Sequence, residues 1–304
     1  MFRKTLFTVV ASIIAYQGVV TAEDNVLNSA VRIQNQEQIQ KDIQNQAQQL
    51  KKEIKKTLVD DAIAIKSETQ RALGFIKKGL NGRALAALER GIGKADVLLA
   101  RHPDETLPPI DFTLSIVDIA PKNLEKISEI THQGVKAINS RDYSKGRTLL
   151  SQLRSEIKVD IICLPLATFS QALKDAARSL ELGNRKEASS ALETALTSLV
   201  AHERIHPIPV LEVIATLTTA ENLIEKDPEN ALKLMERAKV DLSRAVELGY
   251  LAKNDNYNTL NDEIVNLEDE IKRPKPSSSY FSAAKEKLRV IIKNTSGFKS
   301  VTIP

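Results

Sequence analysis

The sequence predicts an all-α chain of antiparallel helical hairpins, forming either a bundle or a degenerate helical-repeat array. Apolar residues recur at the three- and four-residue spacing of amphipathic helices over most of the 304 residues. Strictly alternating patterns, which would indicate strands, are scarce, and aromatic residues make up only 4% of the chain. Small residues also recur at one fixed spacing after short polar turns. Together these observations argue against a β-sandwich or barrel and favour a core of Ala, Leu and Ile.

Residues 1–22 predict a secretory signal peptide. Arg3 and Lys4 supply the positive charge, Leu6–Ala15 is the apolar region, and Val20–Ala22 offers small residues for cleavage after Ala22. The apolar region is too short to span a bilayer, and no later stretch is long and apolar enough. We therefore expect a periplasmic protein that is not integral to the membrane; an uncleaved leader acting as an anchor is the alternative.

Residues 23–58 predict a long amphipathic helix rich in Gln and Asn. Its apolar residues follow one another at helical spacing: Ile39, Ile43, Ala47, Leu50, Ile54 and Leu58. Such a stripe must be covered. It either packs on its own chain, which we expect, or pairs with a second copy in a coiled coil. The second arrangement would make the protein a homo-oligomer.

Residues 59–271 predict a helical-hairpin domain built on one repeated spacing. After a short polar turn comes a small residue. A large apolar residue follows four positions later, and an apolar or small residue follows seven positions later. The four instances are Ala84-Leu88-Gly91, Gly146-Leu150-Leu153, Ala188-Leu192-Ala195 and Ala231-Met235-Ala238. Small residues at these positions let two helices approach closely. Such spacing fits a helical-repeat array and a plain antiparallel bundle equally well.

Residues 272–304 form a basic linker and C-terminal tail. Its basic residues are Lys272, Arg273, Lys275, Lys285, Lys287, Arg289, Lys293 and Lys299, against Glu286 alone. This tail either contacts an anionic membrane surface or acidic partner, or is a solvated extension. The rest of the chain is close to neutral and shows no clustered basic patch, so we do not expect nucleic-acid binding.

The string His202-Glu203-Arg204-Ile205-His206 matches the H-E-x-x-H pattern of zinc hydrolases, in which two His on one helical turn hold the metal. Pro207 follows the second His and disfavours helical geometry there, so we interpret the string as a helix end. Glu221 or Glu225 would have to supply the third ligand. We therefore predict no catalytic, metal or cofactor-binding residues, with a zinc site as the alternative; either His would still titrate near pH 6.

Cys163 is the only cysteine, so no intramolecular disulfide is possible. Its neighbours Ile161, Ile162 and Leu164 predict a buried thiol. No His lies within thirty residues of it in sequence to act as a base.

Four segments together resemble the YfdX family of exported enterobacterial proteins. They are Ile162–Thr168, the hairpin Gly183–Val200, His206–Val210 and Glu247–Tyr250. The resemblance is strong over about residues 159–267 and weaker over 58–118. It implies an all-helical protein with no assigned enzyme activity, an association with acid and antimicrobial stress, and chaperone-like binding. The family offers no established site residues to carry over.

We therefore expect a periplasmic, stress-associated binding protein and not an enzyme. Its partners would be unfolded protein clients or small amphipathic molecules, held in grooves between hairpins. Two alternatives stay open: a zinc-dependent hydrolase using His202, Glu203 and His206, and an oligomeric structural adaptor.

Overall fold

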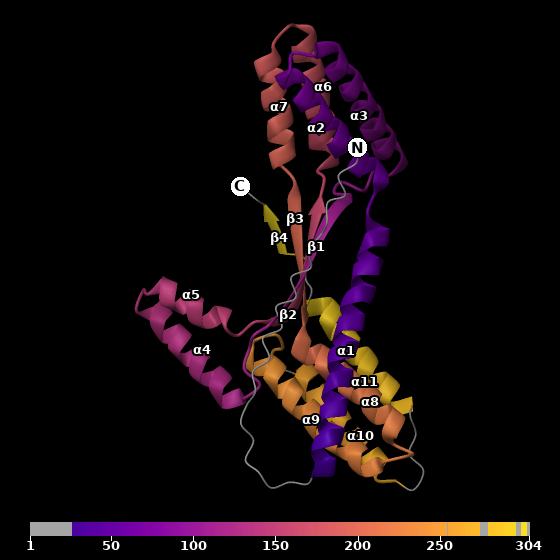
Figure 1. Ribbon diagram of the computed structural model, residues 1–304, viewed down its shortest axis with the longest axis vertical. Helices are drawn as coiled ribbons and strands as arrows, with labels where there is room; N and C mark the ends of the chain where they lie inside the picture. Colours follow the sequence, from indigo (N-terminus) through magenta and orange to yellow (C-terminus); the bar gives the residue numbers. More distant parts are fainter. Residues whose placement is uncertain (1–25, 254, 274–278, 296–298, 303–304) are drawn as a thin grey trace. The chain divides into compact units, whose positions relative to one another are not determined.

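The computed structural model describes residues 26–253, 255–273, 279–295 and 299–302 (Figure 1). The helices are α1 (Val26–Thr57), α2 (Asp60–Lys77), α3 (Asn81–Arg101), α4 (Leu124–Asn139), α5 (Tyr143–Ser151), α6 (Leu166–Glu181), α7 (Arg185–Thr197), α8 (Ile208–Leu223), α9 (Pro228–Glu247), α10 (Asp255–Ile271) and α11 (Ser279–Thr295). The strands are β1 (Pro109–Asp118), β2 (Ser155–Cys163), β3 (Val200–Pro207) and β4 (Lys299–Thr302). The predicted signal peptide, residues 1–22, lies outside the described residues.

The prediction of a mainly helical chain of hairpins is confirmed, and the structure adds an order that the sequence did not reveal. Each of the first three hairpins is followed by a strand: α2–α3 by β1, α4–α5 by β2, and α6–α7 by β3. The hairpin α8–α9 then follows without a strand of its own. The repeating element is therefore a helical hairpin plus one strand.

The chain divides into two compact units that alternate along the sequence. Unit 1 comprises residues 1–49, 115–158 and 205–297, and unit 2 comprises residues 50–114, 159–204 and 298–304. Hairpins α2–α3 and α6–α7 belong to unit 2, whereas α4–α5 and α8–α9 belong to unit 1. The chain passes between the units at residues 114/115, 158/159 and 204/205. These three boundaries fall within β1, β2 and β3, respectively.

The four strands form one sheet in the order β1-β2-β3-β4. Strands β1 and β2 run antiparallel, because Leu164 N–H donates to Pro108 O at 3.0 Å at one end and Ile119 N–H donates to Arg154 O at 3.0 Å at the other. Strands β3 and β4 are also antiparallel, with Val200 opposite Thr302. In β2 every second residue from Ile157 to Cys163 is buried, which is the period of a strand with one covered face.

Unit 2 is a four-helix core of α2, α3, α6 and α7, which lie side by side in Figure 1. The predicted apolar positions Ala84, Leu88, Ala188, Leu192 and Ala195 are all buried in it. Gly91 shows why a small residue is needed: a Cβ there would lie 3.2 Å from Leu173 Cδ1. The small-residue spacing therefore does bring helices close together in this unit.

Unit 1 contains the helices α8 to α11. Ala231, Met235 and Ala238 of α9 are buried as their spacing predicts. Helix α11 belongs to the predicted basic tail, yet it buries Phe281 and Leu288, so this part of the tail is a packed helix. None of the described helices in either unit combines the length and apolarity needed to cross a membrane.

The stripe predicted for the N-terminal helix is covered by the chain itself. Ile43, Ala47 and Ile54 of α1 are each only 4% exposed. Ile54 packs with Val159, Ile161 and Cys163 of β2. These residues of the stripe therefore pack on their own chain, as expected.

The first three hairpins turn in the same way. The first helix ends with a residue of positive φ: Gly79 (71°), Arg141 (62°) and Gly183 (83°). The next amide donates back to the carbonyl five residues earlier, as in Leu80 to Phe75, Asp142 to Ala137 and Asn184 to Ser179. This is the Schellman ending, which favours glycine because its left-handed residue carries no Cβ. The hairpin α4–α5 is the exception, with Arg141 in that position.

Candidate functional site

The string His202–His206 lies in strand β3, so the interpretation of it as a helix end is wrong. In a strand, residues four apart lie about 13 Å from each other, whereas two nitrogens on one zinc lie within about 4 Å. The helical turn that H-E-x-x-H needs is therefore absent. Pro207 ends the strand and serves as the residue preceding α8, where its φ of −65° suits the start of a helix.

The two candidates for a third zinc ligand, Glu221 and Glu225, do not form a metal site with the two histidines. Glu221 of α8 accepts a hydrogen bond from Lys285 Nζ of α11 at 2.5 Å. Glu225 follows the end of α8 and is exposed. Across the residues that the structure describes, no group of three or more His, Cys, Asp or Glu side chains is placed to hold a metal ion.

Cys163 ends β2 and is buried, as its neighbours predict. Burial raises the pKa of its thiol, and the positive charge of Arg204 opposes this only in part. The thiolate needed for nucleophilic chemistry is thus disfavoured. Cys163 is a packing residue of the small cluster that it shares with Ile54 and Val159.

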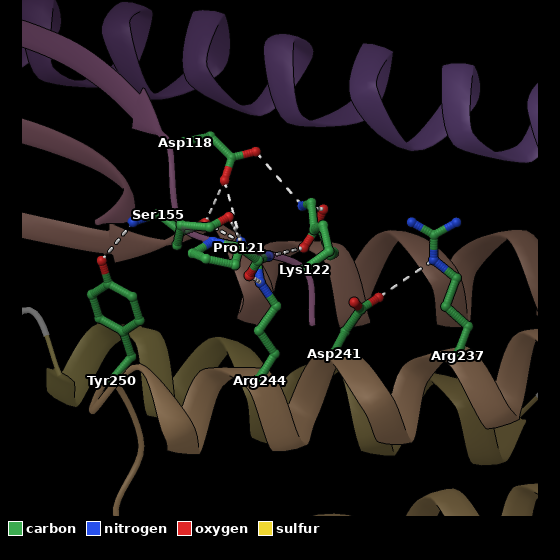
Figure 2. Close-up of polar contacts among 10 residues, drawn as sticks. Asp118, Pro121, Lys122, Ser155, Arg237, Asp241, Arg244 and Tyr250 are labelled. Carbon is green, nitrogen blue, oxygen red and sulfur yellow. Dashed lines mark hydrogen bonds and ion pairs between the residues drawn. The ribbon is translucent and has the colours of Figure 1, made fainter. Parts of the chain in front are cut away.

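The most concentrated polar chemistry in the described chain surrounds Arg244 of α9 in unit 1 (Figure 2). Arg244 is only 1% exposed and is one of the largest fully buried side chains. The residues around it come from five places in unit 1: the end of β1, the loop after it, the start of β2, α8, and α9 itself. We call this set the Arg244 network; it comprises Asp118, Ala120, Pro121, Lys122, Ser155, Glu212, Asp241 and Arg244.

Every nitrogen of the Arg244 guanidinium has an acceptor. Nη1 donates to Glu212 Oε2 at 2.9 Å, and Nε donates to the carbonyl of Pro121 at 3.1 Å. Nη2 lies 3.4 Å from Asp118 Oδ1, 3.3 Å from the carbonyl of Ala120 and 3.2 Å from Ser155 Oγ. A buried charge with this many partners stabilises one arrangement of the segments that carry them, because removing any one partner leaves a buried charge poorly solvated.

Glu212 has a second cation. Lys122 Nζ lies 2.7 Å from Glu212 Oε1 and 3.6 Å from Asp118 Oδ2. Asp118 also accepts a hydrogen bond from Ser155 Oγ at 2.6 Å. Strand β1, strand β2 and helix α8 are thus joined at one point.

Asp241 is the titratable member of the network. Burial raises its pKa to about 6, and the nearby negative charge of Glu212 adds to the effect. The cations Arg237, Lys122 and Arg244 oppose the shift without cancelling it. The closest of them by a direct contact is Arg237, whose Nε lies 3.5 Å from Asp241 Oδ2. Asp241 therefore takes up a proton in mildly acidic solution.

Tyr250, just after α9, adds a second link to β2. Its hydroxyl accepts from Ser155 N–H at 2.9 Å and donates to Glu156 Oε2 at 3.0 Å. Arg154 donates to the other oxygen of Glu156 at 2.7 Å. Burial is the main cause that raises the pKa of the Tyr250 phenol, so it stays a neutral donor.

The network holds both ends of the hairpin α4–α5. The chain enters α4 through Asp118–Lys122 and leaves α5 through Arg154–Glu156, and the network and Tyr250 bind both segments. Ile119 and Ala120 N–H also donate to the carbonyl of Arg154, at 3.0 and 3.1 Å. The hairpin is therefore fixed at its base by polar contacts.

Above that base, the hairpin leaves apolar side chains in solvent. The exposed fractions are 48% for Val135, 39% for Ile138, 64% for Tyr143 and 36% for Leu150. The glycines of the hairpin place these residues: a Cβ on Gly146 would lie 2.7 Å from Ile138 Cγ1, and one on Gly134 would lie 3.0 Å from Leu150 Cδ2. Ile138 and Leu150 therefore lie along the line where the two helices meet. We call Val135, Ile138, Tyr143 and Leu150 the hairpin apolar face.

Our interpretation of the sequence missed the Arg244 network because its members are far apart in the chain. One local signal was available. Glu212 is a single carboxylate inside the apolar run Ile208–Leu217, and a charge there must be buried with a partner. No local signal names Arg244 as that partner.

Comparison with known proteins gives a family match. The model of the YfdX protein family matches residues 64–204, which run from α2 to the middle of β3 and include three hairpins. No match was found among curated proteins. Among solved structures, YfdX from Salmonella Typhi aligns with 49% of this chain and 91% of its own, at 10% identity and a TM-score of 0.34.

The family match and the resemblance in the sequence overlap without coinciding. The match covers Ile162–Thr168 and the hairpin Gly183–Val200, and it ends before His206–Val210 and Glu247–Tyr250. It also includes α4–α5, which the resemblance did not cover. The match of residues 64–204 to the YfdX family model supports the resemblance to that family seen in the sequence.

Proposed function

We propose that this protein is an exported, periplasmic binding protein of the stress response that holds unfolded protein segments or small amphipathic molecules, and that it has no enzymatic activity. The observation that carries the proposal is the hairpin apolar face. Four large side chains between residues 135 and 150 are exposed on a hairpin that is fixed by its base. Large apolar side chains left exposed together on one hairpin are typical of sites that bind other molecules.

Two further observations support a binding role. The Arg244 guanidinium is engaged within the protein, since each of its nitrogens already has an acceptor there. The H-E-x-x-H string lies in a strand, where its spacing does not suit one metal ion. The resemblance to the YfdX family adds the link to acid and antimicrobial stress that it implies.

Suppression of aggregation tests the proposal directly. Heat-unfolded malate dehydrogenase would be mixed with the mature protein at pH 7 and at pH 5, and light scattering would be followed. We expect the protein to slow aggregation in at least one of these conditions. The double variant Val135→Ser/Ile138→Ser should lose at least half of that effect, because it removes the aliphatic part of the hairpin apolar face.

A matched control separates this face from exposed aliphatic residues in general. Val240→Ser/Val265→Ser removes two exposed valines from α9 and α10 in the same unit and should leave protection unchanged. Equal loss in both double variants, or no protection by the wild type at either pH, would refute the binding role assigned to α4–α5. Export is checked separately: the mature protein should begin at Glu23.

A further inference from the structure

The distal end of the hairpin α4–α5 carries cations that have no carboxylate partner. Lys136, Arg141, Lys145 and Arg147 are all exposed, and none of them forms an ion pair with another described residue. Asp142 is the one acid between residues 135 and 150, and its carboxylate accepts from Lys145 N–H at 3.0 Å as the cap of α5. This end of the hairpin is therefore strongly positive.

The cations at the base of the same hairpin are neutralised. Lys126 Nζ lies 2.7 Å from Glu129 Oε2, and Lys122 Nζ lies 2.7 Å from Glu212 Oε1. Unpaired positive charge is thus confined to the part of the hairpin that also carries the apolar face.

The C-terminal tail, for which contact with an anionic surface was one of two alternatives, shows the opposite arrangement. Lys285 pairs with Glu221, Lys287 with Glu263, and Arg289 with Glu286. Lys272 and Arg273 pair with Asp269 and Glu270. These five cations of the tail are therefore engaged within unit 1.

We propose that the distal end of α4–α5 binds a lipid bilayer surface that carries anionic headgroups. The four cations flank the apolar face: Lys136 neighbours Val135 on α4, and Lys145 and Arg147 stand on either side of Gly146, over which Ile138 packs. Long basic side chains lie along apolar surface and place their charge at headgroup depth, and a tyrosine such as Tyr143 suits the same interface. Apolar burial and attraction to anionic lipid act together in such contacts.

A bilayer fits this surface better than an acidic helical peptide does. An amphipathic helix binds by laying its apolar face in a groove. Here the apolar residues lie on a two-helix hairpin with cations on both sides, so a broad surface reaches both sets of charges at once. An acidic peptide is therefore the competing outcome.

Flotation with lipid vesicles tests the assignment on the mature full-length protein. We expect binding to vesicles that contain phosphatidylglycerol, little binding to pure phosphatidylcholine, and weaker binding at high salt because salt screens the attraction. Lys145→Gln/Arg147→Gln should weaken binding to the anionic vesicles about thirty-fold, since each basic residue near such a surface contributes a factor of about five. Tyr143→Ser should weaken it without changing the dependence on salt.

The matched control is Arg83→Gln/Lys186→Gln, which removes two exposed cations from the equivalent first turns of α3 and α7 in unit 2. It should leave vesicle binding unchanged. Absence of wild-type binding to anionic vesicles, equal loss in the control, or binding only to an acidic amphipathic peptide would each overturn the assignment. Loss of vesicle binding with aggregation protection retained would leave the proposed function intact, because that assay contains no lipid.

Discussion

The hairpins α4–α5 and α6–α7 share the same local sequence pattern but are stabilised in different ways. Both turn through a left-handed residue, and both place a small residue four positions before a leucine in the second helix. In α6–α7 that leucine, Leu192, is fully buried against the helices of unit 2, whereas Leu150 of α5 is 36% exposed. The local pattern specifies a hairpin, and the rest of the fold decides whether anything covers it.

The difference extends to what holds each hairpin in place. Helices α6 and α7 contribute Phe169, Leu173 and Leu192 to an apolar core shared with α2 and α3. The hairpin α4–α5 instead depends on the Arg244 network at its base. Hydrophobic burial stabilises α6–α7, and a desolvated ion cluster positions α4–α5.

The largest expected effect comes from breaking that ion cluster. Arg244→Met leaves the buried carboxylate of Glu212 without its guanidinium, and such losses cost about 3–5 kcal/mol. We expect the free energy of unfolding, measured with urea, to fall by this amount. Amide hydrogen exchange in α4–α5 should accelerate more than in α6–α7, because only α4–α5 is anchored by the Arg244 network.

Two variants serve as controls for this result. Arg71→Met removes an exposed partner of Glu68 in unit 2 and should cost less than about 1 kcal/mol. Arg244→Met/Glu212→Leu removes both buried charges and should recover part of the loss. If exchange accelerated equally in both hairpins, the claim that α4–α5 depends on its base would fail.

Truncating Leu192 and Leu150, which occupy equivalent positions in the two hairpins, tests how much the burial of each side chain contributes to stability. Leu192→Ala should cost about 2–5 kcal/mol, because it opens a cavity in the core of unit 2. Leu150→Ala should cost less than about 1 kcal/mol, because the side chain is already partly in water. Urea denaturation of the two single variants gives both values. Similar costs would show that something in solution covers Leu150.

Asp241 makes the stability of the network that anchors α4–α5 depend on pH. The pKa of Asp241 is about 6 in the folded protein, against an ordinary value of 3.8. The folded state binds this proton more tightly, so the resulting stability is fully present below pH 3.8 and is lost as the pH rises through 6. Asp241→Asn should therefore be more stable than the wild type at pH 7.5, by about 1–3 kcal/mol.

The advantage of Asp241→Asn should shrink as the pH falls from 7.5 to 4, because the wild-type side chain becomes neutral as well. Urea denaturation at pH 7.5, 6 and 4 measures it. An advantage that stays constant over this range would mean that Asp241 does not titrate near pH 6.

The smallest effect concerns the turn. Arg141 holds a left-handed conformation that costs about 1 kcal/mol for a residue with a Cβ, so Arg141→Gly should raise the free energy of unfolding by about that amount. The reciprocal change Gly183→Arg should lower it by a similar amount. Thermal melting measures both. Because Arg141 is also one of the distal cations, Arg141→Gly should bind anionic vesicles more weakly while being more stable.

Much of the helical part of the fold was predictable, because amphipathic spacing and small residues depend only on neighbours a few positions apart. Ala84, Leu88, Ala188 and Leu192 were all expected at helix contacts and are buried there. The strands were harder to predict from the sequence. In β3 the residues before Pro207 carry charges and imidazoles in place of an alternating apolar pattern, so pairing with neighbouring strands decides their conformation. In β2 the alternation from Ile157 to Cys163 is a signal that we missed.

The candidate sites were less predictable than the fold. Arg244 and Asp118 are 126 positions apart, and nothing local pairs them. The exposure of Val135 and Tyr143 could not be inferred either, since it depends on which helices happen to cover α4–α5. The basic tail shows the converse error: counting its charges suggested a free surface, whereas Lys285 is 12% exposed and paired with Glu221.

The alternation of the two units along the chain has a consequence for synthesis. Helices α2 and α3 emerge from the ribosome well before α6 and α7, with which they share a core, and α4–α5 emerges long before Arg244 of α9. Neither unit can be completed by a continuous N-terminal fragment shorter than about two thirds of the chain, since unit 2 needs the residues up to 204. Nascent chains of this protein are therefore expected to stay open until late, and no single cut in the sequence will yield either unit as a separate domain.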